Sequence, residues 1–265
     1  MNNNLRLPLF GLDDYGRLLV MLRGAGYDNS IVSKLREPIS TKVVYLRHDV
    51  DIHTSLILEM ARIEKAHGIQ ATYYIPLTLH FNLFYPPNQH VLKELLSLGH
   101  EVGLHYDLQT YPSDPVEERG HLEWEVSVLY RLIGQPIRTI VMHQPHTGQS
   151  DPFRTLDEYI HPHDPRYQDD LLYASDSCRA WRDENLLQCF GSNPPRRLML
   201  NTHPELWLDG NIEDRMTYLD KILRENGIRQ HREYFDQTIR QVWLTHPSPR
   251  LHDKREEYHA KKSES

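Results

Sequence analysis

The sequence predicts an α/β fold in which parallel strands are joined by crossover helices, forming a closed or partly closed barrel in one domain. Segments rich in β-branched and aromatic residues alternate along the chain with helical segments. The length of 265 residues and the hydrophobic content of 39% suffice for one such domain. Aspartate or histidine stands at the ends of five of the six predicted strands, and in such folds the site gathers at that end of the strands.

The N-terminal third of the chain contains four predicted elements. Residues 13–22 form a predicted helix, because acidic residues open it and glycines follow it. Residues 42–47 (KVVYLR) form a predicted buried strand. The predicted helix at residues 54–67 has apolar residues at helical spacing and Gly68 as a C-cap. Residues 71–75 (ATYYI) form the next predicted strand.

The same alternation continues to the C-terminus. Residues 91–98 form a short predicted helix that Gly99 ends. A second helix begins at Asp114-Pro115, where a capping residue precedes a proline, and runs to about residue 133. Residues 212–243 are mostly helical in the prediction. The remaining predicted strands are 101–105, 137–142, 171–174 and 197–201.

The ends of the chain and its composition limit the classes of function. We expect residues 1–245 to form one domain and the charged residues 246–265 to form a flexible tail. There are 30 basic and 37 acidic residues, with a net charge of −7. No basic stripe is present, so neither nucleic acid nor an anionic membrane is an expected partner.

The sequence also predicts a cytoplasmic protein. The N-terminal residues lack a charged-then-apolar signal segment, and no apolar run approaches the roughly 20 residues that span a bilayer. Cys178 and Cys189 lack a C-x-x-C spacing, which favours two ordinary thiols, although a disulfide between them stays open. Residues 81–89, rich in aromatics and prolines, suit a lid or an oligomer interface.

Two aspartates follow the first predicted strand. Asp49 and Asp51 are two residues apart, so in an extended segment both carboxylates point toward one site. Each alone is more simply a helix cap or a solvated loop residue. As a pair close to histidines, they favour chemistry.

Histidines follow three later strands. His105 and Asp107 repeat the two-residue spacing, and a histidine with carboxylates suits zinc or another divalent transition metal. His143 and His146 either line the pocket, complete the metal shell or lie on the surface. His203 has apolar neighbours, and a histidine held at the edge of a pocket is a good general acid.

These segments resemble the motifs of the polysaccharide deacetylases, carbohydrate esterase family 4. The matches run in the family's order and cover roughly residues 42–207. They are residues 49–51 (DVD), residues 99–105 (GHEVGLH), residues 174–177 (ASDS) followed by Trp181, and residues 201–204 (NTHP). The resemblance implies a distorted (β/α) barrel with about seven parallel strands and a divalent metal, most simply zinc.

The resemblance also implies roles for individual residues. Asp49 corresponds to the general base, and Asp51 and His105 correspond to metal ligands. His203 corresponds to the general acid, and Asp176 is the candidate that orients it.

The chain departs from the family in two places. Gln109 occupies the place of a further metal-binding histidine, and Asp107 ranks slightly ahead of His143 and His146 as its substitute. The third-motif loop lacks an arginine, so Arg47 or Arg138 is the candidate for the missing charge.

We expect a metal-dependent amide hydrolase that removes an N-acetyl group from a sugar or glycan precursor. His143, His146, Arg47, Tyr106 and Trp181 are the candidate substrate-binding residues. Tyr73 and Tyr74 also suit a neutral sugar face, although core packing explains at least half of the aromatic candidates. One alternative is a cyclic-amide hydrolase acting on a small nitrogen compound, and another is a non-catalytic carbohydrate-binding protein with a decayed site. His100, at the opposite end of its strand, is expected to be structural.

Overall fold

The computed structural model describes residues 10–77, 82–144, 150–177, 181, 185–208, 217 and 220–225. The chain divides into two compact units, residues 1–214 and residues 215–265. In the second unit, residues 220–225 are helical, and Arg224 pairs with Asp220 one turn away. The predicted boundary at residue 245 and the predicted tail lie outside the described residues and stay predictions.

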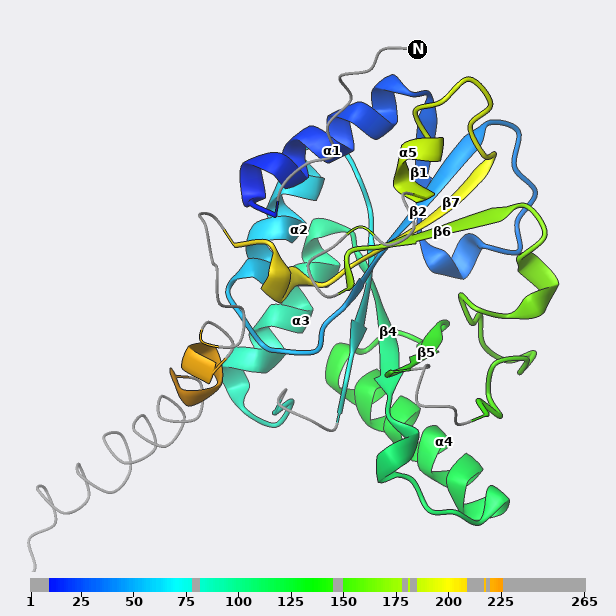
Figure 1. The fold of residues 1–265 in the computed structure, drawn as a ribbon. Helices are drawn as coiled ribbons and strands as arrows, with labels where there is room; N and C mark the ends of the chain where they lie inside the picture. Colours follow the sequence, from blue (N-terminus) through cyan, green and yellow to red (C-terminus); the bar gives the residue numbers. More distant parts are fainter. Residues whose placement is uncertain are drawn as a thin grey trace, which may run out of the picture. The chain divides into compact units, whose positions relative to one another are not determined.

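The first unit is built on one seven-stranded sheet in which all the strand pairs are parallel. The strand order is β5-β4-β3-β2-β7-β6, and β1 also pairs with β2. The sheet curls into half of a barrel flanked by helices (Figure 1), which confirms the predicted distorted barrel of about seven parallel strands. The strands are β1 (Tyr27–Ser30), β2 (Lys42–Asp49), β3 (Thr72–Ile75), β4 (Glu101–Tyr106), β5 (Ile140–Met142), β6 (Leu171–Ser175) and β7 (Arg197–Thr202).

Strand β2 lies in the middle of the sheet, and two strands share one of its edges. Its first half, residues 42–45, pairs with β1, and residues 47–49 pair with β3. On the other edge, β2 pairs with β7 over residues 43–48. The sequence analysis missed β1, because the segment YDNS has no run of β-branched residues and no clear apolar alternation.

The helices lie close to their predicted positions. Helix α4 begins where predicted, because the Asp114 carboxylate accepts the backbone N–H groups of Val116 at 2.9 Å and Glu117 at 3.1 Å. Helix α3 begins five residues earlier than predicted, at Pro86, which takes the first helical position after an extended Tyr85. The helices are α1 (Leu12–Gly24), α2 (Leu56–Ala66), α3 (Pro86–Leu98), α4 (Pro115–Ile133) and α5 (Asn185–Gln188), with 3₁₀ turns η1 (Val32–Lys34), η2 (Leu108–Thr110), η3 (Pro165–Tyr167) and η6 (Pro204–Leu206).

Both faces of the sheet are buried, and alternate residues of β2 belong to different cores. Val44 and Leu46 pack in the larger core, together with residues of α1 and α2. Val43 and Tyr45 pack in the smaller core inside the half-barrel. We call these the outer and inner faces of the sheet. This alternation also sends Arg47 and Asp49 to the inner face, because side chains two residues apart point the same way.

Gly103 in β4 allows the inner face to close. A Cβ atom at this position would lie 2.5 Å from Thr139 Oγ1 and 2.7 Å from the Tyr74 ring. A residue with a side chain would therefore push β3 or β5 aside, two residues before His105. Among the helices that the structure describes, none is both long enough and apolar enough to cross a membrane.

Candidate metal centre

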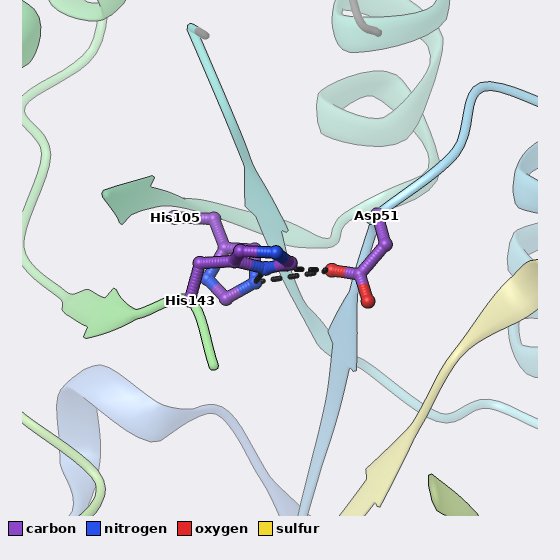
Figure 2. A group of neighbouring side chains, drawn as sticks. All are labelled: Asp51, His105 and His143. Atoms are coloured by element: carbon purple, nitrogen blue, oxygen red, sulfur yellow. Dashed lines mark hydrogen bonds and ion pairs between the residues drawn. The ribbon is translucent and has the colours of Figure 1, made fainter. Parts of the chain in front are cut away.

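Three side chains converge at the carboxyl ends of β2, β4 and β5 (Figure 2). Asp51 Oδ1 lies 3.2 Å from His105 Nε2 and 3.3 Å from His143 Nδ1. The two imidazole nitrogens are themselves 3.2 Å apart. His143 directly follows β5, and Gln144 after it has a φ of 48°, so the chain turns away sharply at this point.

These distances fit the ligands of a small divalent metal. Zinc bonds of roughly 2.0–2.1 Å at the tetrahedral angle place neighbouring ligand atoms about 3.3 Å apart. The three measured separations, 3.2, 3.3 and 3.2 Å, therefore match one face of a tetrahedron. His105 Nδ1 lies 3.2 Å from the carbonyl oxygen of Val141, which directs Nε2 toward the cluster. Two histidines and one carboxylate leave a fourth position for a water or substrate oxygen.

Asp49 lies beside this cluster with one oxygen occupied and one free. Its Oδ2 accepts hydrogen bonds from Arg47 Nη2 and Asn201 Nδ2, both at 3.0 Å. Its Oδ1 is buried and has no partner among the described residues. Burial alone would raise the pKa of Asp49, but the charges of Arg47, His105 and His203 outweigh it and lower the pKa. The carboxylate is therefore ionised at neutral pH.

Arg47 supplies the positive charge whose source the sequence left open. Its guanidinium packs against the rings of Tyr74 and Tyr173, at 5.6 and 5.7 Å from their centroids. The side chain is 2% exposed and bonds to Asp49, so the structure does not support the prediction that Arg47 contacts substrate. Arg138, the other candidate for this charge, is exposed.

His203 and Asp176 form a second pair at the ends of β7 and β6. His203 Nδ1 lies 2.6 Å from Asp176 Oδ1, and the His203 backbone N–H donates to Asp176 Oδ2 at 3.1 Å. Trp207 Nε1 donates to the same Oδ2 at 2.7 Å. Burial alone would lower the pKa of His203, but the charges of Asp176, Asp51 and Asp49 raise it well above 6.5. The predicted pairing of Asp176 with His203 is therefore present, and His203 is protonated at neutral pH.

Two residues assigned to the site do not reach it. Asp107, ranked first as the third ligand, lies outside the cluster, because the chain turns into η2 and its carboxylate caps that turn at the Gln109 N–H, 3.0 Å away. The third side chain that converges with Asp51 and His105 is instead that of His143. Tyr106, predicted to contact substrate, is fully buried and donates to Asp151 at 2.6 Å. It follows His105 directly in β4 and therefore points to the opposite face.

The remaining predicted residues have four different outcomes. Trp181 is half-buried and stacks on Phe10 at 5.7 Å, and its role in substrate binding stays a prediction. His146 lies outside the described residues. Tyr73 and Tyr74 are fully buried, as the core-packing interpretation predicted. His100 is structural, as predicted, since its Nδ1 accepts the Ala71 N–H at 3.1 Å.

The sequence analysis missed two residues of the inner face. Asn201 holds Asp49, and Tyr173 lies 3.2 Å from the Asn201 amide through its hydroxyl group. The signal for Asn201 was present, because it precedes His203 by two residues, the spacing used for Asp49 and Asp51. Tyr173 gave no such signal, since it depends on how β6 lies against β7.

Comparisons with known proteins give similarities only among solved structures. No family model and no curated protein matches the chain. A peptidoglycan N-acetylglucosamine deacetylase domain from Eubacterium rectale is 14% identical over 72% of this chain and 87% of its own, with a TM-score of 0.44. A carbohydrate esterase family 4 pseudoenzyme from Bacillus anthracis is 19% identical over 70% of this chain, with a TM-score of 0.41.

The chain is similar to structures of carbohydrate esterase family 4. It spans 62% of the length of that pseudoenzyme chain. A family 4 domain of a xylanase from a termite hindgut metagenome (Trinervitermes trinervoides) is 12% identical over 72% of this chain and 85% of its own, with a TM-score of 0.43. TM-scores below 0.5 at such identities establish no activity for this chain, so the geometry of its own side chains has to support the function.

Proposed function

We propose that the protein is a metal-dependent amide hydrolase that removes the acetyl group from an N-acetylated sugar or glycan precursor. The observation that carries the proposal is the convergence of Asp51, His105 and His143 close to two further charged groups. One is the ionised carboxylate of Asp49, and the other is the protonated imidazole of His203. A base that is ionised and an acid that is protonated at the same pH are what hydrolysis of an amide requires.

Asp51, His105 and His143 are the residues that would hold the metal. When bound, a divalent ion supplies Lewis acidity and lowers the pKa of a nearby water. Asp49 takes the proton from the attacking water, because its Oδ1 is the one carboxylate oxygen left free by Arg47 and Asn201. These two donors also fix the plane of the carboxylate and therefore the direction of Oδ1.

His203 donates the second proton. Its Nδ1–H is held by Asp176 at 2.6 Å, which leaves the Nε2–H to protonate the departing amine nitrogen. The charge of Asp176 keeps this imidazole protonated before the reaction and fixes its orientation. Protonation of the nitrogen lets the carbon–nitrogen bond break without releasing a free amide anion.

Gln109 does not argue for a decayed site. Its side chain is exposed, and three ligand atoms already converge without a histidine at that position. The ordered motif resemblance favours an N-acetylated sugar over a cyclic amide as substrate. The enzyme therefore uses a ligand set of its own, with His143 from the end of β5 as the third member.

The test combines metal content with amine release. Full-length protein is incubated with zinc, cobalt or nickel, and the bound metal is counted in wild type, His105→Ala and the control His90→Ala, whose side chain is 74% exposed. We expect about one metal ion in wild type and in the control, and its loss in His105→Ala. The loaded wild type is then assayed with N-acetylglucosamine oligomers and, separately, with cyclic ureides.

Each result decides between the candidate functions. Release of amine from the oligomers supports the proposal. Ring opening of ureides without deacetylation would replace it with the cyclic-amide function. A protein that binds no metal, or that binds metal and hydrolyses neither substrate, would be the non-catalytic protein with a decayed site.

A further inference from the structure

A second cluster of titratable side chains lies on the outer face of β2, around a buried glutamate of α2. Glu64 is fully buried and accepts hydrogen bonds from the hydroxyl groups of Tyr15 and Tyr73, the latter at 2.8 Å. Its Oε1 also lies 2.6 Å from His48 Nε2. The proposed reaction uses none of these groups.

The protons in this cluster can be assigned from the backbone. His100 Nδ1 accepts the Ala71 N–H at 3.1 Å, and its Nε2 lies 3.0 Å from the Ala61 carbonyl oxygen. His100 is therefore neutral, with its proton on Nε2, and Nδ1 has no proton to give to Glu64. The pKa of Glu64 is lowered although burial raises it, because His48 lies beside the carboxylate. His48 Nε2 is thus the donor in that bond.

His48 continues this chain of hydrogen bonds to the neighbouring strand. Its Nδ1 lies 2.7 Å from the hydroxyl oxygen of Thr202 in β7. His48 and Thr202 are register partners, so the contact joins β2 to β7 at the last paired position of the ladder. The next residue of each strand is a proposed catalytic group, Asp49 after His48 and His203 after Thr202.

The register partners one position earlier also connect β2 to β7 through their side chains, but on the inner face. Arg47 and Asn201 are register partners one position earlier, and both donate to Asp49 Oδ2 at 3.0 Å. Two consecutive positions of the β2–β7 ladder are therefore tied by side chains on opposite faces. The inner contacts hold the carboxylate itself, and the outer contact holds the two backbones from which Asp49 and His203 extend.

The outer chain has the order of an acid–histidine–hydroxyl triad, but it cannot act as one. Glu64, His48 and Thr202 all have 0% exposure, so no substrate reaches the hydroxyl group. A buried carboxylate and a buried histidine thus support one contact between two strands. Burying these two polar groups costs free energy that a pair of apolar side chains at the same place would not cost. A requirement for a fixed separation at this position accounts for that choice.

We propose that Glu64 and His48 are positioning residues that, through Thr202, set the placement of Asp49 relative to His203. The inference rests on the roles given to Asp49 and His203 in the proposed function. Its test needs no catalysis, however, because the placement can be read from His203 alone. The charge of Asp49 contributes to the environment of that imidazole, so a change in their separation changes its titration.

The sharpest comparison uses two variants that each remove one hydroxyl group from the same cluster. Thr202→Val removes the contact between the strands and keeps the β-branched shape. Tyr73→Phe removes a donor to Glu64 and leaves the contact between His48 and Thr202 in place. The pKa of His203 is measured in each metal-free, full-length protein by ¹⁵N-histidine NMR, with Glu64→Gln as a third variant.

We expect the pKa of His203 to fall by about half a pH unit in Thr202→Val and Glu64→Gln, because a looser ladder increases its mean distance from Asp49. Tyr73→Phe should leave it within about 0.2 units of wild type. Unchanged titration in all three variants would reduce the cluster to a structural role, and an equal shift in Thr202→Val and Tyr73→Phe would show general loosening. Either result overturns the proposal. If Glu64→Gln does not fold, the matched hydroxyl variants still decide.

Discussion

The two polar clusters on either side of β2 contain similar residues, but they differ in solvent exposure and in how many of their polar atoms have hydrogen-bond partners. On the inner face, Asp51 has a side chain that is 31% exposed, and Asp49 keeps an oxygen without a partner among the described residues. On the outer face, Glu64 is fully buried and has three donors. Histidine and carboxylate content alone would rank the two clusters equally.

This difference in exposure and hydrogen bonding shows which of the two clusters could bind a ligand. A cluster whose hydrogen-bonding groups are all used within the protein can hold a shape, but it has nothing left for a ligand. Within the described part of the chain, the inner cluster keeps an Asp49 oxygen without a partner, a His203 ring nitrogen that Asp176 does not use, and three ligand atoms at metal spacing. Access and unused bonding capacity therefore separate a site from a buried network.

The largest expected effect comes from the free oxygen of the inner cluster. Asp49→Asn should lower kcat by about 10²- to 10⁴-fold, because the amide cannot take a proton from water. Metal content should stay at the wild-type value, since Asp49 is not among the converging ligands. Amine release and metal content are measured on the same preparation. Activity near the wild-type level in this variant would remove Asp49 from the mechanism.

The outer cluster should respond in stability. Glu64→Leu leaves three buried donors without an acceptor and should lower the free energy of unfolding by about 3–5 kcal/mol. Glu125→Leu in α4 is the matched control, because among the described residues that buried glutamate accepts one hydrogen bond, from the Tyr111 hydroxyl group at 2.5 Å. Urea denaturation measures both. Equal losses would contradict the view that the number of donors decides the cost.

A third measurement tests which residue completes the ligand set. His143→Ala should weaken zinc binding by about 100-fold or more, since it removes one of three ligands. Asp107→Ala should leave the affinity within a few-fold, because that carboxylate caps η2 at the Gln109 N–H. Competition with a zinc chelator gives both values. The opposite ranking would restore the ligand set expected from the sequence.

The smallest expected effect is a shift in pH dependence. His203 must be protonated to act, and its raised pKa keeps the proton through neutral pH. Activity should therefore fall as pH rises through that pKa. Asp176→Asn removes the main charge that raises it, so the alkaline limb should move to lower pH by about one unit. A pH–rate profile with an unmoved alkaline limb would show that Asp176 does not set the pKa of the group that acts as the acid.

The sequence predicted the fold well where side-chain pattern decides the structure. The six strands other than β1 and the cap at Asp114 followed from apolar runs and local turn chemistry. Strand β1 did not, because its pairing depends on β2 and its own residues are polar. Whether a short segment forms a strand depends on the strand that it pairs with, and a single sequence does not show this pairing.

The site was predicted in its residue types and less well in its geometry. Asp51 and His105 converge as the motif resemblance implied, although their role as ligands stays a prediction. Asp107 lies outside the converging group because β4 ends at Tyr106 and η2 begins two residues later, which a sequence does not show. The assignment of Tyr106 to substrate binding could have been avoided, because strict alternation from His105 already places its side chain on the outer face.

One edge of β2 pairs with β1 at the start of the strand and with β3 at its end, so the two ends of β2 can differ in local stability. On this edge, residues 42–45 pair with β1, whereas residues 47–49 pair with β3. Fraying of the four-residue β1 can thus expose backbone amides at the start of β2 to hydrogen exchange without opening the end that carries Asp49. The protein can tolerate fluctuation at one end of this strand while the other end stays closed.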